Sequence, residues 1–168
     1  VLLRVLQQPF GKHWQFSECD ILDKRRVSAI GLDIDGTITQ DPAFFSALTR
    51  DCRRHGISTH VVSSRSREGR TDTIIELREY QITYDELYLL PSISEAQTLC
   101  PYGELDWFSR HGWLKSDYAL RNGLSHFVDD DERILALFRK YTPGIEVISV
   151  IERYRLRALI PNVSASHG

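Results

Sequence analysis

Short apolar segments alternate with longer segments of helical periodicity between residues 27 and 151. The apolar segments are four to six residues long, which is typical of strands buried on both faces of a parallel sheet. They predict strands at residues 27–32, 57–62, 85–90, 125–128 and 146–151.

The intervening segments carry helix signals. Asp41 followed by Pro42 fits an N-cap and the first helical residue, and Gly56 fits the position just after the C-terminus of that helix. Apolar residues at helical spacing predict further helices, at residues 71–80, at 107–122, which Gly112 could interrupt, and at 134–141.

Alternating strands and helices indicate an α/β fold with a mostly parallel central sheet. We expect a Rossmann-like three-layer α/β/α sandwich over residues 27–152, between an N-terminal extension (1–26) and a C-terminal tail (153–168). In the helix at 71–80 we expect Ile74, Ile75 and Leu77 to face the core.

Composition indicates the cellular compartment of the protein more than its function. The 168-residue chain is 42% hydrophobic and 26% charged, as in ordinary globular proteins, and its net charge of −2 offers no broad surface for nucleic acid. Three scattered cysteines, no membrane-spanning run and no secretory signal predict a cytoplasmic protein without a membrane partner. The sequon beginning at Asn162 is then a chance match.

The strand at 27–32 ends in a pair of carboxylates. Asp33 and Asp35 are two residues apart and point to the same side if the strand continues. Two close carboxylates repel each other unless a cation joins them, and hard oxygen ligands suit Mg²⁺. A carboxylate beside a metal can also act as a nucleophile. The alternative is a plain Asp-Gly turn after a strand.

Other polar residues also follow predicted strands. Ser63 and Ser64 end the second strand, and Asp129 and Asp130 end the fourth. Parallel strands place these ends on one edge of the sheet, where α/β folds bind ligands. Together with Lys115, which precedes the fourth strand, they predict a metal-assisted phosphoryl-transfer site. Taken singly, the serines fit turn residues and Lys115 a solvated helix lysine.

In this order the segments resemble the four motifs of the haloacid dehalogenase (HAD) superfamily of phosphotransferases. The matching segments are Asp33-Ile-Asp35-Gly36-Thr37, Val61-Val62-Ser63-Ser64-Arg65, Lys115 and His126-Phe127-Val128-Asp129-Asp130. The resemblance runs from about Val27 to Ile151 and implies a HAD-like fold and a Mg²⁺-dependent phosphatase.

The resemblance also implies a role for each matching residue. Asp33 would form an aspartyl-phosphate and bind Mg²⁺, and Asp35 would protonate the leaving oxygen and bind the metal through its carbonyl. Asp130 is the favoured direct metal ligand, with Asp129 beside it. The residues expected to hold phosphate are Thr37, Ser63, Ser64, Arg65 and Lys115.

Substrate choice in this superfamily depends largely on cap insertions. The chain has no room for a separate cap domain, and residues 92–113 are expected to form a loop or a very small lid. Such an open site favours a large phosphorylated substrate. Coverage of the site by a second copy in a homo-oligomer would instead suit a small metabolite.

Three arginines follow the second motif. Arg65, Arg67 and Arg70 could bind substrate phosphate, or could be paired with acidic residues of the next helix, such as Glu76. The segment that begins at Ser63 is similar to the 3′-phosphatase domain of polynucleotide kinases, so a polynucleotide 3′-phosphatase is the minority alternative. A catalytically silent interaction module is a further alternative.

Overall fold

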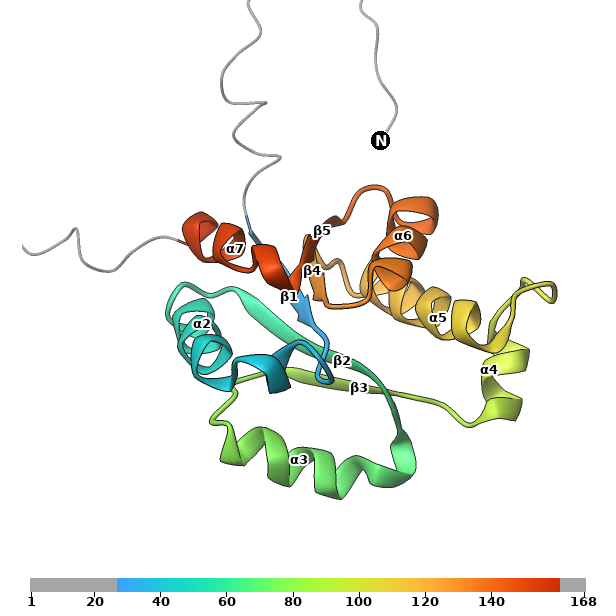
Figure 1. The fold of residues 1–168 in the computed structure, drawn as a ribbon, viewed down its shortest axis with the longest axis horizontal. Coiled ribbons are helices and arrows are strands. Elements are labelled where there is room, and N and C mark those ends of the chain that lie inside the picture. The colour runs from blue at the N-terminus through green and yellow to red at the C-terminus, as the bar shows by residue number, and fades with distance from the viewer. Residues whose placement is uncertain (1–26, 161–168) are drawn as a thin grey trace, which may run out of the picture.

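The computed structural model describes residues 27–160. Its centre is a five-stranded, all-parallel sheet in the order β3-β2-β1-β4-β5 (Figure 1). The strands are β1 (Ala29–Leu32), β2 (Ser58–Ser66), β3 (Glu86–Leu90), β4 (His126–Asp129) and β5 (Glu146–Ser149). The prediction of a Rossmann-like α/β fold is confirmed.

Helices cover both faces of this sheet (Figure 1). Helices α2, α3 and α7 pack on one face, and α5 and α6 on the other. The helices are η1 (Ile38–Gln40), α2 (Pro42–Arg54), η2 (Arg67–Gly69), α3 (Arg70–Glu79), α4 (Ile93–Leu99), α5 (Trp107–Arg121), α6 (Glu132–Tyr141), η3 (Val150–Glu152) and α7 (Tyr154–Leu159). Within residues 27–160, no helix combines the length and apolar character that crossing a membrane requires.

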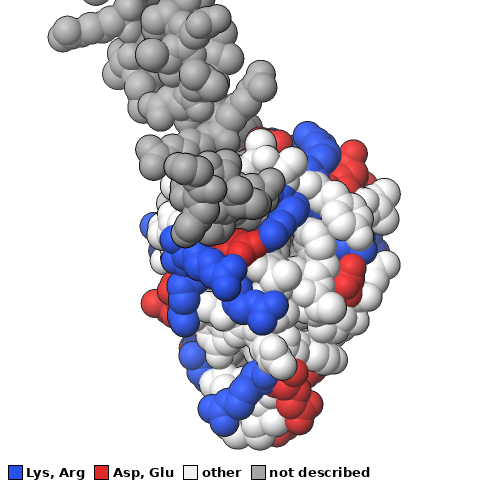
Figure 2. Space-filling view, turned by 90° about the vertical axis from the view of Figure 1, so that its left-hand side faces the viewer, with Lys and Arg blue, Asp and Glu red and all other residues white. Residues whose placement is uncertain are grey.

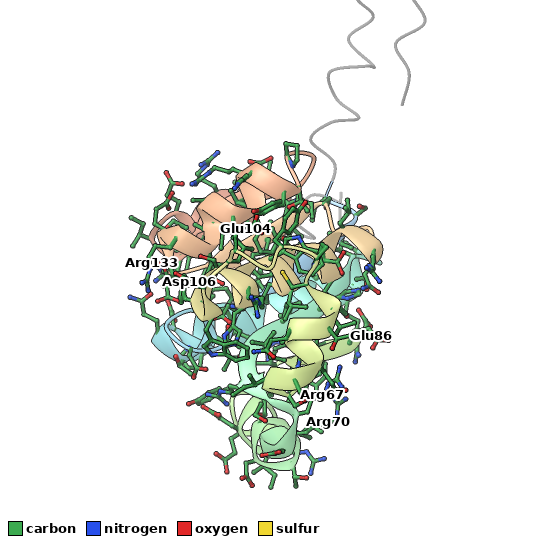
Figure 3. All side chains as sticks on the ribbon, turned by 90° about the vertical axis from the view of Figure 1, so that its right-hand side faces the viewer. Arg67, Arg70, Glu86, Glu104, Asp106 and Arg133 are labelled. Carbon is green, nitrogen blue, oxygen red and sulfur yellow. The ribbon has the colours of Figure 1, made fainter. Side chains whose placement is uncertain are left out.

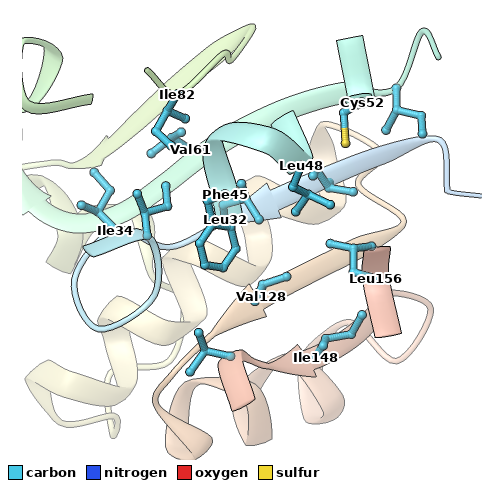
Figure 4. Close-up of a cluster of buried hydrophobic side chains, with 14 of the residues drawn as sticks. Leu32, Ile34, Phe45, Leu48, Cys52, Val61, Ile82, Val128, Ile148 and Leu156 are labelled. Atoms are coloured by element: carbon cyan, nitrogen blue, oxygen red, sulfur yellow. The ribbon is translucent and has the colours of Figure 1, made fainter. Parts of the chain in front are cut away.

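The alternation of side chains along each strand divides the core into two layers. In β1, Ile30 and Leu32 belong to the larger layer, under α2 and α7, while Ala29 belongs to the layer under α5 and α6. The larger layer surrounds Phe45 and Leu48 of α2, which are fully buried (Figure 4). Apolar residues therefore fill both faces of the strands, as expected for a buried parallel sheet.

Local signals place the ends of α2 where the sequence predicts them. The Asp41 carboxylate accepts a hydrogen bond from the Phe44 backbone N–H at 3.1 Å, and Pro42 is the first helical residue. Gly56 has φ +66° just beyond the helix C-terminus, in the left-handed region that glycine tolerates best.

Some expectations are corrected by tertiary packing. The second strand does not end at Val62: β2 continues to Ser66, with an irregularity in its pairing with β3 between Ser63 and Ser66. Ile75 does not face the core and is 49% exposed, because the helical repeat places it across α3 from the buried Leu77.

The segment after β3 is more helical than expected. Helix α5 is not interrupted at Gly112, where a Cβ would lie 2.3 Å from the Leu137 side chain of α6, so glycine here permits close helix packing. Residues 92–113, expected to be a loop or a very small lid, contain α4 and the first turns of α5. A capping box between Ser92 and Glu95 begins α4.

Several predictions made from sequence concern residues that the structure does not describe. The N-terminal extension (1–26), the sequon at Asn162 and the end of the C-terminal tail lie outside the described residues. Cys52 and Cys100, which are described, are buried free thiols.

The strand order creates one topological switch point. From β1 the chain builds the sheet outward through β2 to β3, then returns to the other side of β1 to add β4 and β5. The crossovers from β1 and β4 therefore lie on opposite faces. In doubly wound sheets the crevice at such a point, at the carboxyl ends of the strands, is where ligands bind.

Gly31 is required by the close pairing of β1 with β4. A Cβ on Gly31 would lie 2.5 Å from Cδ2 of Phe127, whose buried ring stacks on Phe138 and has little room to move. We expect Gly31→Ala to lower the free energy of unfolding by about 1–3 kcal/mol, measured by urea denaturation. Gly103→Ala is the matched control, since its Cβ meets nothing within 4 Å. An unchanged stability of Gly31→Ala would contradict this view of the core.

Candidate active site

Lys115 lies at the switch point between two aspartates. Its Nζ donates to Oδ1 of Asp33 at 2.7 Å and to Oδ2 of Asp129 at 2.9 Å. The three side chains come from α5 and from the ends of β1 and β4, and all are almost completely buried. The structure thus brings together three predicted site residues.

Burial and mutual charge shift the titration of these groups. Burial raises the pKa of Asp33 to about 7, with Asp129 adding to the effect and Lys115 opposing it. Burial likewise raises the pKa of Asp129. Burial opposes the charge on Lys115, but the two carboxylates outweigh it and raise the pKa of the ammonium group. The cluster therefore has one ammonium group for two carboxylates and lacks a second positive charge.

Asp130 completes a set of oxygen donors beside Lys115. Asp33, Asp129 and Asp130 each offer a carboxylate oxygen, and these oxygens lie within 4.8 Å of one another. Three carboxylates against one ammonium leave an excess of negative charge that a divalent cation would balance. All-oxygen donors are the kind Mg²⁺ prefers, so the residues fit this ion.

The loop after β1 shapes the position of Asp130. Gly36 has φ +76°, and a Cβ there would lie 2.3 Å from Oδ2 of Asp130. The hydroxyl of the buried Thr37 donates to Oδ1 of Asp130 at 3.5 Å. The loop therefore contacts the Asp130 carboxylate through the Gly36 backbone and the Thr37 hydroxyl. Position 36 has room for no residue larger than glycine.

Asp35 is held by an arginine rather than by the lysine cluster. Arg65 donates through Nε and Nη2 to the two carboxylate oxygens of Asp35, at 2.9 and 2.6 Å, and also pairs with Glu76 of α3. The hydrogen bonds that Arg65 donates, first to Asp35 and then to Glu76, raise the pKa of Arg65. Hydrogen bonding to Arg65 lowers the pKa of Glu76.

The other predicted phosphate ligands are placed differently. Ser63 is buried, and its hydroxyl accepts a hydrogen bond from the Arg65 backbone N–H at 3.2 Å, whereas Ser64 is exposed. Arg67 pairs with Glu95 of α4 at 3.5 Å, and Arg70 donates to the Leu87 carbonyl at 3.1 Å. Figure 3 shows both arginines on the same side of the molecule as α4. Of the three arginines, Arg65 alone contacts a predicted catalytic residue.

Two contributors to this site were not assigned a role from the sequence. Glu76 was considered only as a partner that would neutralise the arginines, yet it contacts Arg65 while Arg65 also contacts Asp35. The close contact of Gly36 with Asp130 spans residues 94 positions apart. The pairing of Arg65 with Glu76 was one of the alternatives expected from the sequence. No local signal reveals the contact of Arg65 with Asp35 or of Gly36 with Asp130, because both depend on the fold.

Comparisons with known proteins support the fold. No family model matches the chain, and no curated protein matches it in sequence. Among the solved structures that resemble it are two described as the Pnkp1/Rnl/Hen1 RNA repair complex and the Pnkp1/Rnl/Hen1 complex. Their TM-scores are 0.54 and 0.52, their sequence identities are 16% and 14%, and each covers 73% of this chain. This chain spans 42% and 46% of the matched chains, less than half of each.

Magnesium binding should depend on pH through Asp33. Its raised pKa of about 7 means that the folded protein binds a proton more tightly than the unfolded chain does, so stability without metal falls as pH rises from about 4 to 7. A cation competes with that proton. We therefore expect Mg²⁺ to raise Tm more at pH 8 than at pH 5, in thermal melts with and without EDTA. Asp33→Asn should remove most of this difference. An equal effect of Mg²⁺ on the Tm of the unaltered protein at both pH values would contradict the predicted pH dependence.

Gly36 offers a second test of the metal site. In Gly36→Ala the new Cβ would displace the Asp130 carboxylate, so we expect Mg²⁺ affinity to fall about tenfold or more, measured by titration calorimetry. Gly56→Ala is a matched control, because Gly56 also has positive φ (+66°) but its Cβ would meet nothing within 4 Å. The two variants should lose similar backbone stability, and equal losses of Mg²⁺ affinity would argue against the proposed ligand.

Proposed function

We propose that this chain is a Mg²⁺-dependent phosphomonoesterase of the HAD type, acting through an aspartyl-phosphate on Asp33. The observation that carries the proposal is the buried Lys115 between Asp33 and Asp129 at the switch point of the sheet. A lysine in that place supplies fixed positive charge beside the nucleophile, where phosphoryl oxygens would lie.

The proposed reaction uses two carboxylates in different environments. Asp33 attacks phosphorus, a new O–P bond forms on its carboxylate, and the bond to the leaving oxygen breaks. Asp35 donates a proton to that leaving oxygen, then takes a proton from the water that hydrolyses the aspartyl-phosphate. Asp33 is 4% exposed and Asp35 has an exposed side chain, so the nucleophile is enclosed while the acid–base group is accessible to substrate and water.

Several residues would hold the phosphoryl group and its charge. Lys115 and the Ser63 hydroxyl would donate to phosphoryl oxygens, and Thr37 lies beside Asp130. Asp33, Asp129 and Asp130 would hold Mg²⁺, which when bound offsets the negative charge of the carboxylates and the phosphate.

Arg65 would act on the reaction through Asp35. Its two-pronged hydrogen bonding fixes the orientation of the Asp35 carboxylate, and Glu76 in turn fixes the guanidinium. An arginine already paired with two carboxylates is a weak phosphate ligand until one of them is released. Arg65 is therefore better explained as a positioning residue in the present arrangement than as a free anion site.

A polynucleotide 3′-phosphatase is the second candidate. It is supported by the similarity in fold to chains of an RNA repair complex, together with the local similarity around Ser63 and Arg65. An open site is also supported, because α4 packs on α5 through Ala96 and Trp113 instead of forming a separate cap domain.

Removing the nucleophile tests the mechanism. We expect p-nitrophenyl phosphate hydrolysis to require Mg²⁺, to stop in EDTA, and to fall by about 10³-fold or more in Asp33→Asn, because no aspartyl-phosphate can form. Asp72→Asn makes the same chemical change at an exposed position and should keep full activity. Activity that survives chelation or Asp33→Asn would sink the mechanism. Mg²⁺ binding without hydrolysis of any phosphoester would favour a catalytically silent interaction module.

A substrate panel separates the two candidates. The panel compares kcat/KM for nucleotides, sugar phosphates, phosphopeptides and oligonucleotides with a 3′-phosphate. A preference for the oligonucleotide of about 100-fold or more over mononucleotides would support the polynucleotide candidate, because binding energy from the rest of the strand would be used in the transition state. The same oligonucleotide with a 5′-phosphate is the matched control.

A further inference from the structure

Arginines in the described part of the chain are nearly all paired. Within residues 27–160, every arginine side chain donates a hydrogen bond or forms an ion pair with another described residue, apart from three. The three are Arg50 and Arg53 of α2 and Arg78 of α3. Two of them, Arg50 and Arg78, line the same hollow although they come from different helices.

This hollow has a volume of about 410 Å³, within the range of small-molecule pockets. Arg50 lines it from α2, Ile74 and Arg78 from α3, and residues 81–84 from the connection to β3. Because this connection enters the amino end of β3, the hollow is at the opposite edge of the sheet from Asp33. Figure 2 shows blue side chains gathered on the face formed by α2, α3 and α7.

The floor of the hollow is fixed by hydrogen bonds to α2. The Ser46 hydroxyl donates to the Gln81 carbonyl at 3.1 Å, and the Thr83 N–H donates to Oγ1 of the buried Thr49 at 3.2 Å. Gln81 has φ +55°, the one non-glycine residue with positive φ in the described part of the chain. Such a conformation is strained for a residue with a Cβ, and hydrogen bonds hold it here: the Ser46 hydroxyl donates to the Gln81 carbonyl, and the Gln81 N–H donates to the Arg78 carbonyl.

The chemistry of the lining combines two charges with an apolar wall. Two guanidinium groups that have no carboxylate partner among residues 27–160 suit the oxygens of a phosphate. Ile74, Ile82 and Tyr84 offer apolar and aromatic surface that suits a sugar or a base. The negative end of a helix favours arginine in the last turn, which accounts for Arg53 and Arg78 but not for Arg50, one turn earlier in α2.

We propose that this hollow, bounded by Arg50, Arg78 and residues 81–84, binds a nucleotide phosphate outside the active site. The nucleotide is either free or part of a strand. The proposal does not depend on the phosphatase activity, since no residue of the hollow belongs to the catalytic cluster. Binding here would hold a nucleotide on the protein without occupying the position of the reacting phosphate.

Chemical-shift mapping on the full ¹⁵N-labelled chain tests the proposal. The probes are AMP, in EDTA buffer so that the proposed hydrolysis does not run, and an oligonucleotide without terminal phosphates. We expect saturable shifts at the amides of residues 81–84 with at least one probe. Tighter binding of AMP would identify a free nucleotide as the ligand, and tighter binding of the oligonucleotide would identify a strand. Shifts confined to residues 33–37, or no saturation at millimolar probe, would overturn the proposal.

Charge variants separate a site from general attraction. Arg50→Gln and Arg78→Gln should each raise Kd about tenfold or more. Arg53→Gln removes a charge that has no partner within residues 27–160 and does not line the hollow, so it should leave Kd within about twofold. An equal weakening in all three variants would mean non-specific attraction and would also overturn the proposal. All three side chains are exposed, and the spectrum of each free variant verifies its fold.

Discussion

A buried ammonium group cannot remain in a protein core without partners, and this constraint governs the centre of the molecule. Moving an ion from water into the interior costs several kcal/mol unless its charge and hydrogen bonds are matched. Lys115 meets this requirement only when the ends of β1 and β4 bring Asp33 and Asp129 to it. The same three groups therefore hold three elements together and define the place where chemistry is proposed.

Matching the lysine does not neutralise the site. One ammonium faces two buried carboxylates, and the third carboxylate, Asp130, is exposed beside them. A site with this residual charge repels anions until a cation is present. Under the proposed function, the metal would therefore bind before the phosphorylated substrate. The hollow lined by Arg50 and Arg78 differs in this respect, because its charged side chains are positive and have no acidic partner within residues 27–160.

Sequence reasoning succeeds where the cause is local and fails where the cause is a neighbour brought by the fold. Asp41 and Gly56 mark the ends of α2 because capping and positive φ depend on adjacent residues. The meeting of Asp33 and Asp129 could also be predicted, because all strands of a parallel sheet have their carboxyl ends on one edge. The continuation of β2 to Ser66 and the pairing of Arg65 with Asp35 depend on packing partners that no local pattern encodes. The exposure of Ile75, in contrast, follows from the helical repeat that places it across α3 from Leu77.

The position of β1 in the middle of the sheet has a consequence for synthesis on the ribosome. Strand β1 is made before its partner β4, which follows about a hundred residues later, after β2 and β3. Until β4 emerges, one edge of β1 is open. A nascent chain of this length therefore exposes an apolar strand edge of the kind that recruits chaperones or pairs wrongly. The central placement that serves the site thus makes the unfinished chain vulnerable.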